Sequence, residues 1–327
     1  MAEVTVSRAE AEALAEAALT AHGATLANAR PTARAMCLAE AEGNPVCGLY
    51  YLPHFCAQLA VGKIDGKAVP VVRAEGGVVW VDAATGFAHP AYDAGLPALL
   101  QAVAEQGLAA MSIGNSGNAL ALGHFVRPLA GRGLVGLAMS NAPASVAPPG
   151  AVRRLFGTNP LAWAAPRDGG PPIVVDQSLS AVTKTAVMMR EASGQALEPG
   201  WAQDAGGRPT LDAAAALAGS LLPAGGQKGA NMALLVEVLS AALSGGHLSP
   251  EASSLGDSEG GPPRLGQFVL ALDPARFGEG FADRIATIAG FFAAAGLRLP
   301  GALHGPTEQL TLPEELWAGV RRLAGRA

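Results

Sequence analysis

The arrangement of short apolar runs in the middle of the chain constrains the fold more than any other feature. Helical patterns separate some of these runs, over 94–107, in a segment ending near Ala130, from about Ser180, and over 228–243. Because strands and helices alternate irregularly, the region predicts a mixed α/β domain rather than a doubly wound parallel sheet. The runs with the length and composition of buried strands are residues 69–73, 77–82, 109–113, 134–139, 161–164, 173–176 and 267–272.

Both ends of the chain have helical patterns. Ser7 followed by Glu10 forms a capping box, in which the hydroxyl and the carboxylate satisfy free N–H groups at the start of a helix. Further helices are expected over about 28–42 and 52–61. From Arg284 onward the chain is predicted to be helical again and to pack on the N-terminal helices.

The composition excludes several classes of protein. Half of the 327 residues are hydrophobic and 15% are charged, so the chain has ample material for a core. The 22 basic and 27 acidic residues give a net charge of −5 without a basic stripe, so we expect no nucleic-acid partner. The apolar stretches are interrupted by polar residues, glycine or proline, or are too short to cross a bilayer, so no membrane association is expected. With no signal-peptide pattern and only three cysteines, a cytoplasmic protein is expected.

Two glycine-rich segments are candidates for binding a phosphate-bearing ligand. Residues 131–136 (GRGLVG) match the dinucleotide fingerprint, but a helix precedes them and a strand follows, so a turn at a helix end is the better interpretation. Residues 222–229 (LPAGGQKG) place a glycine turn and Lys228 at the start of a helix, which can form an anion site. An ordinary turn with a solvated lysine explains the same segment equally well.

Polar residues follow the predicted strand at 173–176. Asp176, Ser178 and Ser180 either cap the following helix or line the mouth of a ligand site at the strand end. Spacing alone favours the cap.

The histidines and cysteines do not suggest a metal site. The spacing of Cys47, His54 and Cys56 matches no structural zinc pattern, and buried small hydrophobic residues are the better interpretation of the cysteines. His89 and His124 have no acidic neighbour in the sequence and are expected at the surface or at helix caps.

Several stretches together resemble the malate/L-lactate dehydrogenase-like oxidoreductases, which are unrelated to the Rossmann dehydrogenases. They are residues 156–160 (FGTNP), 175–178 (VDQS), 200–204 (GWAQD) with 207–210 (GRPT), and 222–229, in the family's order. Asp176-Gln177 and the 200–210 segment are most similar to the Δ1-piperideine-2-carboxylate/Δ1-pyrroline-2-carboxylate reductase branch. The resemblance implies an NAD(P)H-dependent homodimer with a non-Rossmann mixed sheet, NADPH being the expected cofactor and NADH the alternative.

The resemblance also implies a division of the chain and a set of cofactor ligands. Residues 1–67 with 284–327 would form a helical domain for substrate binding and dimerisation, and residues 68–283 a mixed α/β nicotinamide-binding domain. Lys184 could pair with a 2′-phosphate, although an exposed lysine is the default expectation. The residues expected to bind the cofactor are Ser140, Asn141, Thr158, Asn159, Asp176, Gln177, Ser178, Ser180, Lys184, Gln227 and Lys228.

The chain departs from the family where the substrate would bind. Residues 46–51 (VCGLYY) stand in place of the family's Ser-His-Gly-x-x-Arg, so Cys47 replaces the proton-donating histidine and Tyr51 replaces the arginine. Asn118 replaces a second histidine, and residues 302–303 (AL) replace polar residues after the C-terminal Pro-Gly. The residues predicted to act in catalysis are Cys47, Asp176, Tyr51 and Asn118.

These substitutions favour a C=N substrate over a keto acid. Reduction of a carbonyl needs a positioned acid, and a neutral thiol with an ordinary pKa of ~8.5 cannot offer a cation to the developing alkoxide. An imine that is already protonated is itself an electrophilic cation, so its reduction depends much less on an acid supplied by the protein. Tyrosine at position 51 removes an arginine that would clamp a substrate carboxylate through two hydrogen bonds. Either Arg153 or Arg154 takes its place, or the substrate lacks the usual carboxylate. Asp176 is expected to orient a polar partner or the substrate nitrogen.

The predicted function is NAD(P)H-dependent reduction of the C=N bond of a small cyclic imine or ketimine, 2-imino acids included, with a specificity altered from the family's. Two alternatives stay open. One is a non-redox enzyme on the same scaffold, with Cys47 as nucleophile or acid–base group. The other is a non-catalytic nucleotide-binding or structural dimer.

Overall fold

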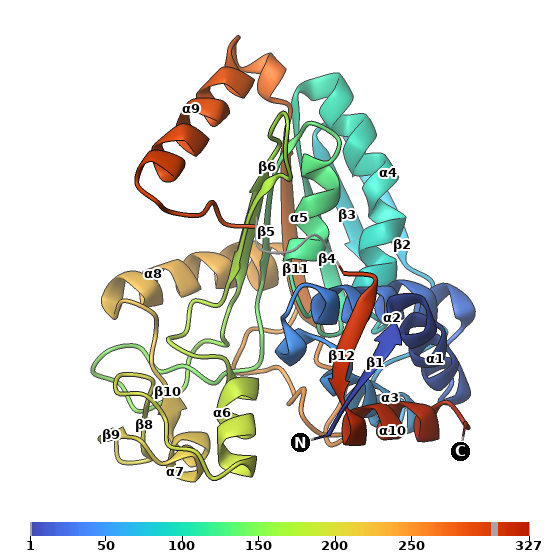
Figure 1. Ribbon diagram of the computed structural model, residues 1–327, viewed down its shortest axis with the longest axis vertical. Helices are drawn as coiled ribbons and strands as arrows, with labels where there is room; N and C mark the ends of the chain where they lie inside the picture. The colour runs from blue at the N-terminus through green and yellow to red at the C-terminus, as the bar shows by residue number, and fades with distance from the viewer. Residues whose placement is uncertain (1, 302–306, 327) are drawn as a thin grey trace.

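A seven-stranded sheet lies at the centre of the computed structural model, which describes residues 2–301 and 307–326 (Figure 1). The strand order is β2-β3-β4-β11-β5-β6-β7. β3 and β4 pair in parallel and every other neighbouring pair is antiparallel, which confirms the predicted mixed sheet. The strands are β2 (Val71–Glu75), β3 (Val78–Asp82), β4 (Leu108–Ser116), β11 (Leu265–Leu272), β5 (Val135–Ser140), β6 (Leu161–Ala165) and β7 (Ile173–Gln177).

Helices cover both faces of the sheet. α4 (Ala88–Gln106) and α5 (Gly123–Ala130) pack on one face, and α8 (Gln227–Val236) packs on the other and continues into a π-helical turn, η3 (Glu237–Ala242). Along β11, Val269 and Ala271 face α4 and α5 whereas Phe268 and Leu270 face α8, as strand alternation requires. The GRGLVG segment is the turn between α5 and β5, so the fingerprint is correctly set aside.

A helical unit forms at the N-terminus and includes the end of the chain. Ser7 Oγ accepts a hydrogen bond from Glu10 N, which confirms the predicted start of the first helix. The two-stranded sheet was not predicted, because its strands are short and nearly the whole chain separates them. The elements are β1 (Glu3–Ser7) paired with β12 (Gln309–Pro313), and the helices α1 (Arg8–Ala21), α2 (Leu26–Ala41), α3 (Leu52–Ala60) and α10 (Glu314–Leu323).

Helix α9 (Phe281–Ala294) lies far from that unit, at the opposite end of the molecule (Figure 1). Ile285 packs with Ala165 and Ile173 at the β6–β7 edge of the central sheet. The expectation that the chain from Arg284 returns to the N-terminal helices holds for β12 and α10 and is wrong for α9. An apolar stripe predicts that a helix packs, but it does not say which surface it covers. The division into two domains stays a prediction.

A small lobe faces the N-terminal unit across a cleft. The predicted helix from Ser180 begins at Lys184, because its N-cap is Thr183, whose side chain accepts from Ala186 N. The hydroxyls of Tyr51 and Thr185 lie 3.3 Å apart and join the two sides. Among the described helices, none is long and apolar enough to cross a membrane. The lobe contains α6 (Lys184–Ala192), α7 (Ala213–Ala218), β8 (Ala202–Gln203), β9 (Pro209–Thr210) and β10 (Ser220–Leu221).

Candidate active site

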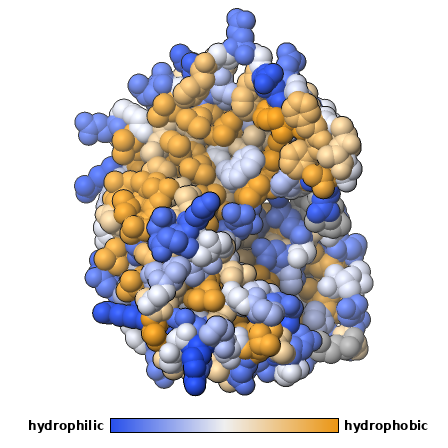
Figure 2. Space-filling view, turned by 90° about the vertical axis from the view of Figure 1, so that its left-hand side faces the viewer, coloured by the Kyte–Doolittle hydropathy of each residue, from blue (hydrophilic) through white to orange (hydrophobic). Residues whose placement is uncertain are grey.

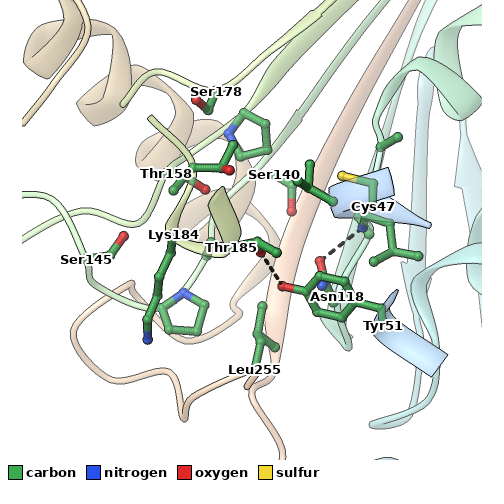
Figure 3. Close-up of a pocket in the computed structure, with 18 of the residues that line it drawn as sticks. Cys47, Tyr51, Asn118, Ser140, Ser145, Thr158, Ser178, Lys184, Thr185 and Leu255 are labelled. Carbon is green, nitrogen blue, oxygen red and sulfur yellow. Dashed lines mark hydrogen bonds between the residues drawn. The ribbon is translucent and has the colours of Figure 1, made fainter. Parts of the chain in front are cut away.

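The cleft holds a cavity of about 330 Å³ (Figure 3). It is formed by the turn between α2 and α3, the segment after β4, the ends of β5 and β7, and the start of α6. The four residues predicted to act in catalysis all line it. Of the predicted cofactor ligands, the cavity is lined by Ser140, Asn141, Thr158, Asp176, Gln177, Ser178 and Lys184.

Two 3₁₀ turns, η1 (Pro45–Cys47) and η2 (Leu49–Tyr51), carry Cys47 and Tyr51 into the cleft. The Glu40 carboxylate accepts a hydrogen bond from Leu49 N at 2.8 Å and fixes the junction between the turns. Gly48 leaves room for this contact, because a Cβ at this position would overlap the Glu40 side chain and displace it. The turn geometry therefore depends on a glutamate from α2.

The Cys47 thiol is protonated at neutral pH. Burial, with the charge of Asp176, raises its pKa to about 12, although a hydrogen bond with Asn44 acts in the opposite direction. A thiol needs its thiolate form to act as a nucleophile. Cys47 can donate a hydrogen bond or a proton, but its surroundings do not activate it as a nucleophile, which disfavours the non-redox alternative.

Tyr51 and Asn118 are neutral hydrogen-bonding groups that meet beside Cys47 (Figure 3). Burial raises the pKa of Tyr51, whose hydroxyl interacts with the side chains of both Thr185 and Asn118. Asn118 Oδ1 accepts from Leu120 N at 3.0 Å, and this turn holds Leu120 in the left-handed region at φ 54°. Such a conformation is unfavourable for leucine and is found where the surrounding structure enforces it.

Asp176 lies at the end of β7 and lines the cleft. Its Oδ2 atom accepts from Gly123 N at 2.8 Å, so it caps α5 and not the helix that follows it in sequence. The residue is exposed on the cleft wall, yet the protein packed around the carboxyl group raises its pKa to about 6, with Glu42 contributing. The carboxylate is therefore the main form at neutral pH. The expectation that Asp176 caps the following helix is wrong, because Thr183 caps α6, and the role of Asp176 in the site stays a prediction.

A group of ionisable residues lies behind Asp176. Glu42 pairs with Arg127 at 3.0 Å, and His124 Nε2 lies 3.8 Å from the same carboxylate. The expectation that His89 and His124 are surface or capping residues is wrong: both side chains are buried, and burial lowers the pKa of each, to about 3 and about 4. Sequence neighbours could not reveal this, because the packing comes from α2, α4 and α5.

The other half of the cleft is rich in hydroxyl groups. Figure 3 shows Ser145, Thr158 and Ser178 on the side away from Cys47, with Lys184 beside them. Ser145 was not predicted. Hydroxyls and an ammonium group are donors that suit the phosphates of a dinucleotide.

Four predicted cofactor ligands do not line the cavity. Asn159 is fully buried and donates to Glu237 Oε2 at 2.8 Å, so it supports the fold beneath the site. Ser180 is also buried and donates to Val182 O at 2.6 Å. Gln227 and Lys228 are exposed at the start of α8. Proximity to a motif in sequence does not determine which way a side chain points. Residues 302–303, also singled out, lie outside the described residues.

A loop that the sequence did not single out closes one side of the cleft. Leu255 and Gly256 line the cavity, and the loop is held from below by Lys63, which is 2% exposed. Lys63 Nζ donates to Ser254 O at 2.7 Å and to Asp257 Oδ1 at 3.3 Å. No pattern predicts a lysine buried against loop carbonyls.

Residues 6–320 match the model of the malate/L-lactate dehydrogenase family. The chain belongs to this family. It is therefore an oxidoreductase, and the resemblance found in the sequence is confirmed. Within the described residues no group of three or more His, Cys, Asp or Glu side chains could hold a metal ion.

Named relatives cover almost the whole chain. The chain is 43% identical to (2R)-3-sulfolactate dehydrogenase (NADP(+)) of Chromohalobacter salexigens, over 98% of each protein. It is 37% identical to Δ1-pyrroline-2-carboxylate/Δ1-piperideine-2-carboxylate reductase of Pseudomonas putida, over 97% of this chain and 96% of the relative. The crystal structure of Δ1-piperideine-2-carboxylate reductase from Pseudomonas syringae superposes with a TM-score of 0.91 at 34% identity, covering 98% of this chain and 99% of that chain.

Proposed function

We propose that the protein is an NADPH-dependent reductase of the C=N bond of a cyclic imine or ketimine. The observation that carries this proposal is the division of the cleft into two halves. One half offers hydroxyls and Lys184, and the other offers the Cys47 thiol and the Tyr51 hydroxyl. The Asp176 carboxylate also lines the cavity, close enough to Cys47 for its charge to raise the pKa of the thiol. The names of the pyrroline and piperideine carboxylate reductases support C=N reduction, and the name of the sulfolactate dehydrogenase supports NADP.

The hydroxyl-rich half fits a phosphorylated dinucleotide. Ser145, Thr158 and Ser178 would donate to phosphate oxygens, and Lys184 would pair with the 2′-phosphate that distinguishes NADPH from NADH. Bound there, NADPH supplies a hydride. The chain's own residues bind and orient both molecules and exclude bulk water from the narrow region beside Cys47.

The residues at the Cys47 end suit an iminium better than a carbonyl. When a hydride adds to the carbon of a protonated imine, the π electrons move to nitrogen and cancel its positive charge, so no alkoxide forms. A neutral thiol stabilises a developing alkoxide much less than an imidazolium does. Asp176 would hold the N–H group of the substrate, and Cys47 would donate a hydrogen bond to the nitrogen lone pair that forms as the hydride adds to carbon. This chemistry argues against reduction of a keto acid.

Nucleotide titration tests the proposal. We expect NADPH to bind with a micromolar Kd and NADH about tenfold more weakly, because Lys184 has no 2′-phosphate partner in NADH. Fluorescence and thermal shift would report both affinities. Lys184→Ala should bring the NADPH affinity close to that of NADH and leave NADH binding unchanged. Absence of binding by either nucleotide at millimolar concentration would contradict hydride chemistry.

We also propose a homodimer that forms through the α8 side of the molecule, and not through the N-terminal helical unit to which the resemblance assigned dimerisation. Figure 2 shows apolar side chains gathered over the upper part of this side. A continuous apolar surface of this kind marks a protein interface. The exposed side chains that α8 and its continuation contribute are Met232, Leu234, Leu235, Val238 and Leu243.

The mass in solution tests the dimer. We expect light scattering to give twice the chain mass of 32.8 kDa, and Val238→Asp to shift the protein toward the single-chain mass. Val61→Asp, at a similarly exposed position at the end of α3, is the matched control and should leave the dimer intact. A single-chain mass for the unaltered protein would overturn the proposal.

A further inference from the structure

We propose that the substrate is a cyclic imine without a carboxylate group, bound as its N-protonated cation with the N–H group facing Asp176. This inference rests on the proposed reductase function and names its substrate class. The proposed substrate lacks the 2-carboxylate that appears in the names of the pyrroline and piperideine reductases. The inference follows from the charges that line the cleft.

Among the residues that the structure describes, none at the Cys47 end of the cleft is a cation that could hold a carboxylate. Within the part of the chain that the structure describes, Lys184 is the one lysine or arginine that lines the cavity. Figure 3 shows its side chain on the Ser145 side, away from Cys47 and Tyr51. Val46, Cys47, Tyr51 and Asn118 provide only neutral groups at this end.

Neither the arginine nearest Asp176 nor the two considered as replacements for the clamp faces the substrate. Arg127 pairs with Glu42 behind the site and does not line the cavity. Arg154 donates to the carbonyl of Leu217 at 2.6 Å and to that of Ala218 at 2.9 Å. Arg153 is exposed and also lies outside the lining. Neither Arg153 nor Arg154 replaces the clamp that Tyr51 removes.

The charge that does face the substrate is negative. Asp176 lines the cavity, and the charge of Glu42 behind it is paired with Arg127. An added carboxylate would therefore meet the negative charge of Asp176, with no described cation beside it on the cavity wall at this end. A protonated imine instead gains an ion pair with Asp176. During reduction the hydride adds to carbon, the C=N electron pair moves to nitrogen, and the product is a neutral amine that takes a proton from water.

Besides the Ser140 hydroxyl near Cys47, apolar side chains line the cavity and would accept the faces of a small ring. These apolar side chains favour contact with a hydrocarbon ring, and they offer no hydrogen-bond donors to a carboxylate. The apolar side chains are Val46, Ala119, Leu120, Ala121, Met188 and Leu255.

A matched pair of substrates tests the proposal. 2-Methyl-1-pyrroline and Δ1-pyrroline-2-carboxylate share a ring and differ only in a methyl or a carboxylate on the same carbon. With NADPH present, we expect kcat/KM to be about tenfold or more higher for the methyl compound. A higher kcat/KM for the carboxylate would overturn the inference while leaving the reductase function in place.

Binding of the products separates a failure of the inference from a failure of the function. If neither imine is reduced, the proposed reductase function fails on these substrates, and calorimetry on the complex with NADP+ still decides the charge preference. Tighter binding of 2-methylpyrrolidine than of proline supports a cationic ligand without a carboxylate. Tighter binding of proline overturns it.

Substitution of Tyr51 provides a second readout. Tyr51→Arg restores a cation at the carboxylate position and should shift the ratio of the two kcat/KM values toward the carboxylate by about tenfold or more. Tyr51→Phe removes the hydroxyl, adds no charge and is the control that should keep the preference for the methyl compound. A ratio that is unchanged in Tyr51→Arg would place the carboxylate site elsewhere and overturn the inference.

Discussion

Lys63→Met is expected to lower the free energy of unfolding by about 3 kcal/mol, because three partly buried loop carbonyls lose their shared donor at once. Lys63 Nζ donates to the backbone of Ser254, Asp257 and Glu259, and its side chain is 1% exposed. The same contacts hold Leu255 against the cleft. Substrate KM should therefore rise about tenfold while kcat changes less, as for a positioning residue.

Chemical denaturation and steady-state kinetics measure the two effects. Lys67→Met is the matched control, since Lys67 is exposed and only its backbone N–H is bonded, to Asp65. This control should change stability by less than about 0.5 kcal/mol. Equal stability and equal KM in the Lys63 variant would show that the loop does not depend on this lysine.

The central sheet was predictable because its strands are short apolar runs bounded by turns, and these runs match β2 to β7 and β11 closely. Pairing between distant segments was not, as β1 and β12 show, because a single sequence does not record which of its distant segments pair with one another. The packing of α9 was missed for a related reason. Its sequence predicts an apolar stripe but not the sheet edge that the stripe covers.

Resemblance located the candidate site better than local patterns did. The replacement of the family's histidine and arginine led to Cys47 and Tyr51, which the fold brings together with Asn118 and Asp176 in one cleft. Asn159 was misassigned because its motif is adjacent to the site while its side chain points into the protein. The buried surroundings of residues such as Lys63 arise from three-dimensional packing and leave no signal in a single sequence.

For a cyclic imine, kcat/KM is expected to fall below about pH 6 as Asp176 becomes protonated and loses its attraction for the iminium. Burial and Glu42 raise the pKa of Asp176 to about 6, and the N–H groups of Gly123 and Leu122 and the charge of Arg127 act against this. The buried Cys47 thiol and the neutral His124 imidazole, whose pKa values lie near 12 and 4, do not titrate in this range. The lower limb of the profile should therefore report Asp176.

Asp176→Asn should abolish this lower limb and reduce kcat/KM at about pH 8 by roughly a hundredfold, since the ion pair is lost. Asparagine can still accept from Gly123 N, so the start of α5 should stay intact. The stability difference has a defined sign. Because folding raises the pKa of Asp176, the unaltered protein should gain stability relative to the variant as pH falls from about 6 toward about 4. A variant that keeps the limb near pH 6 would assign it to another group, and a variant as active as the unaltered protein would remove Asp176 from substrate binding.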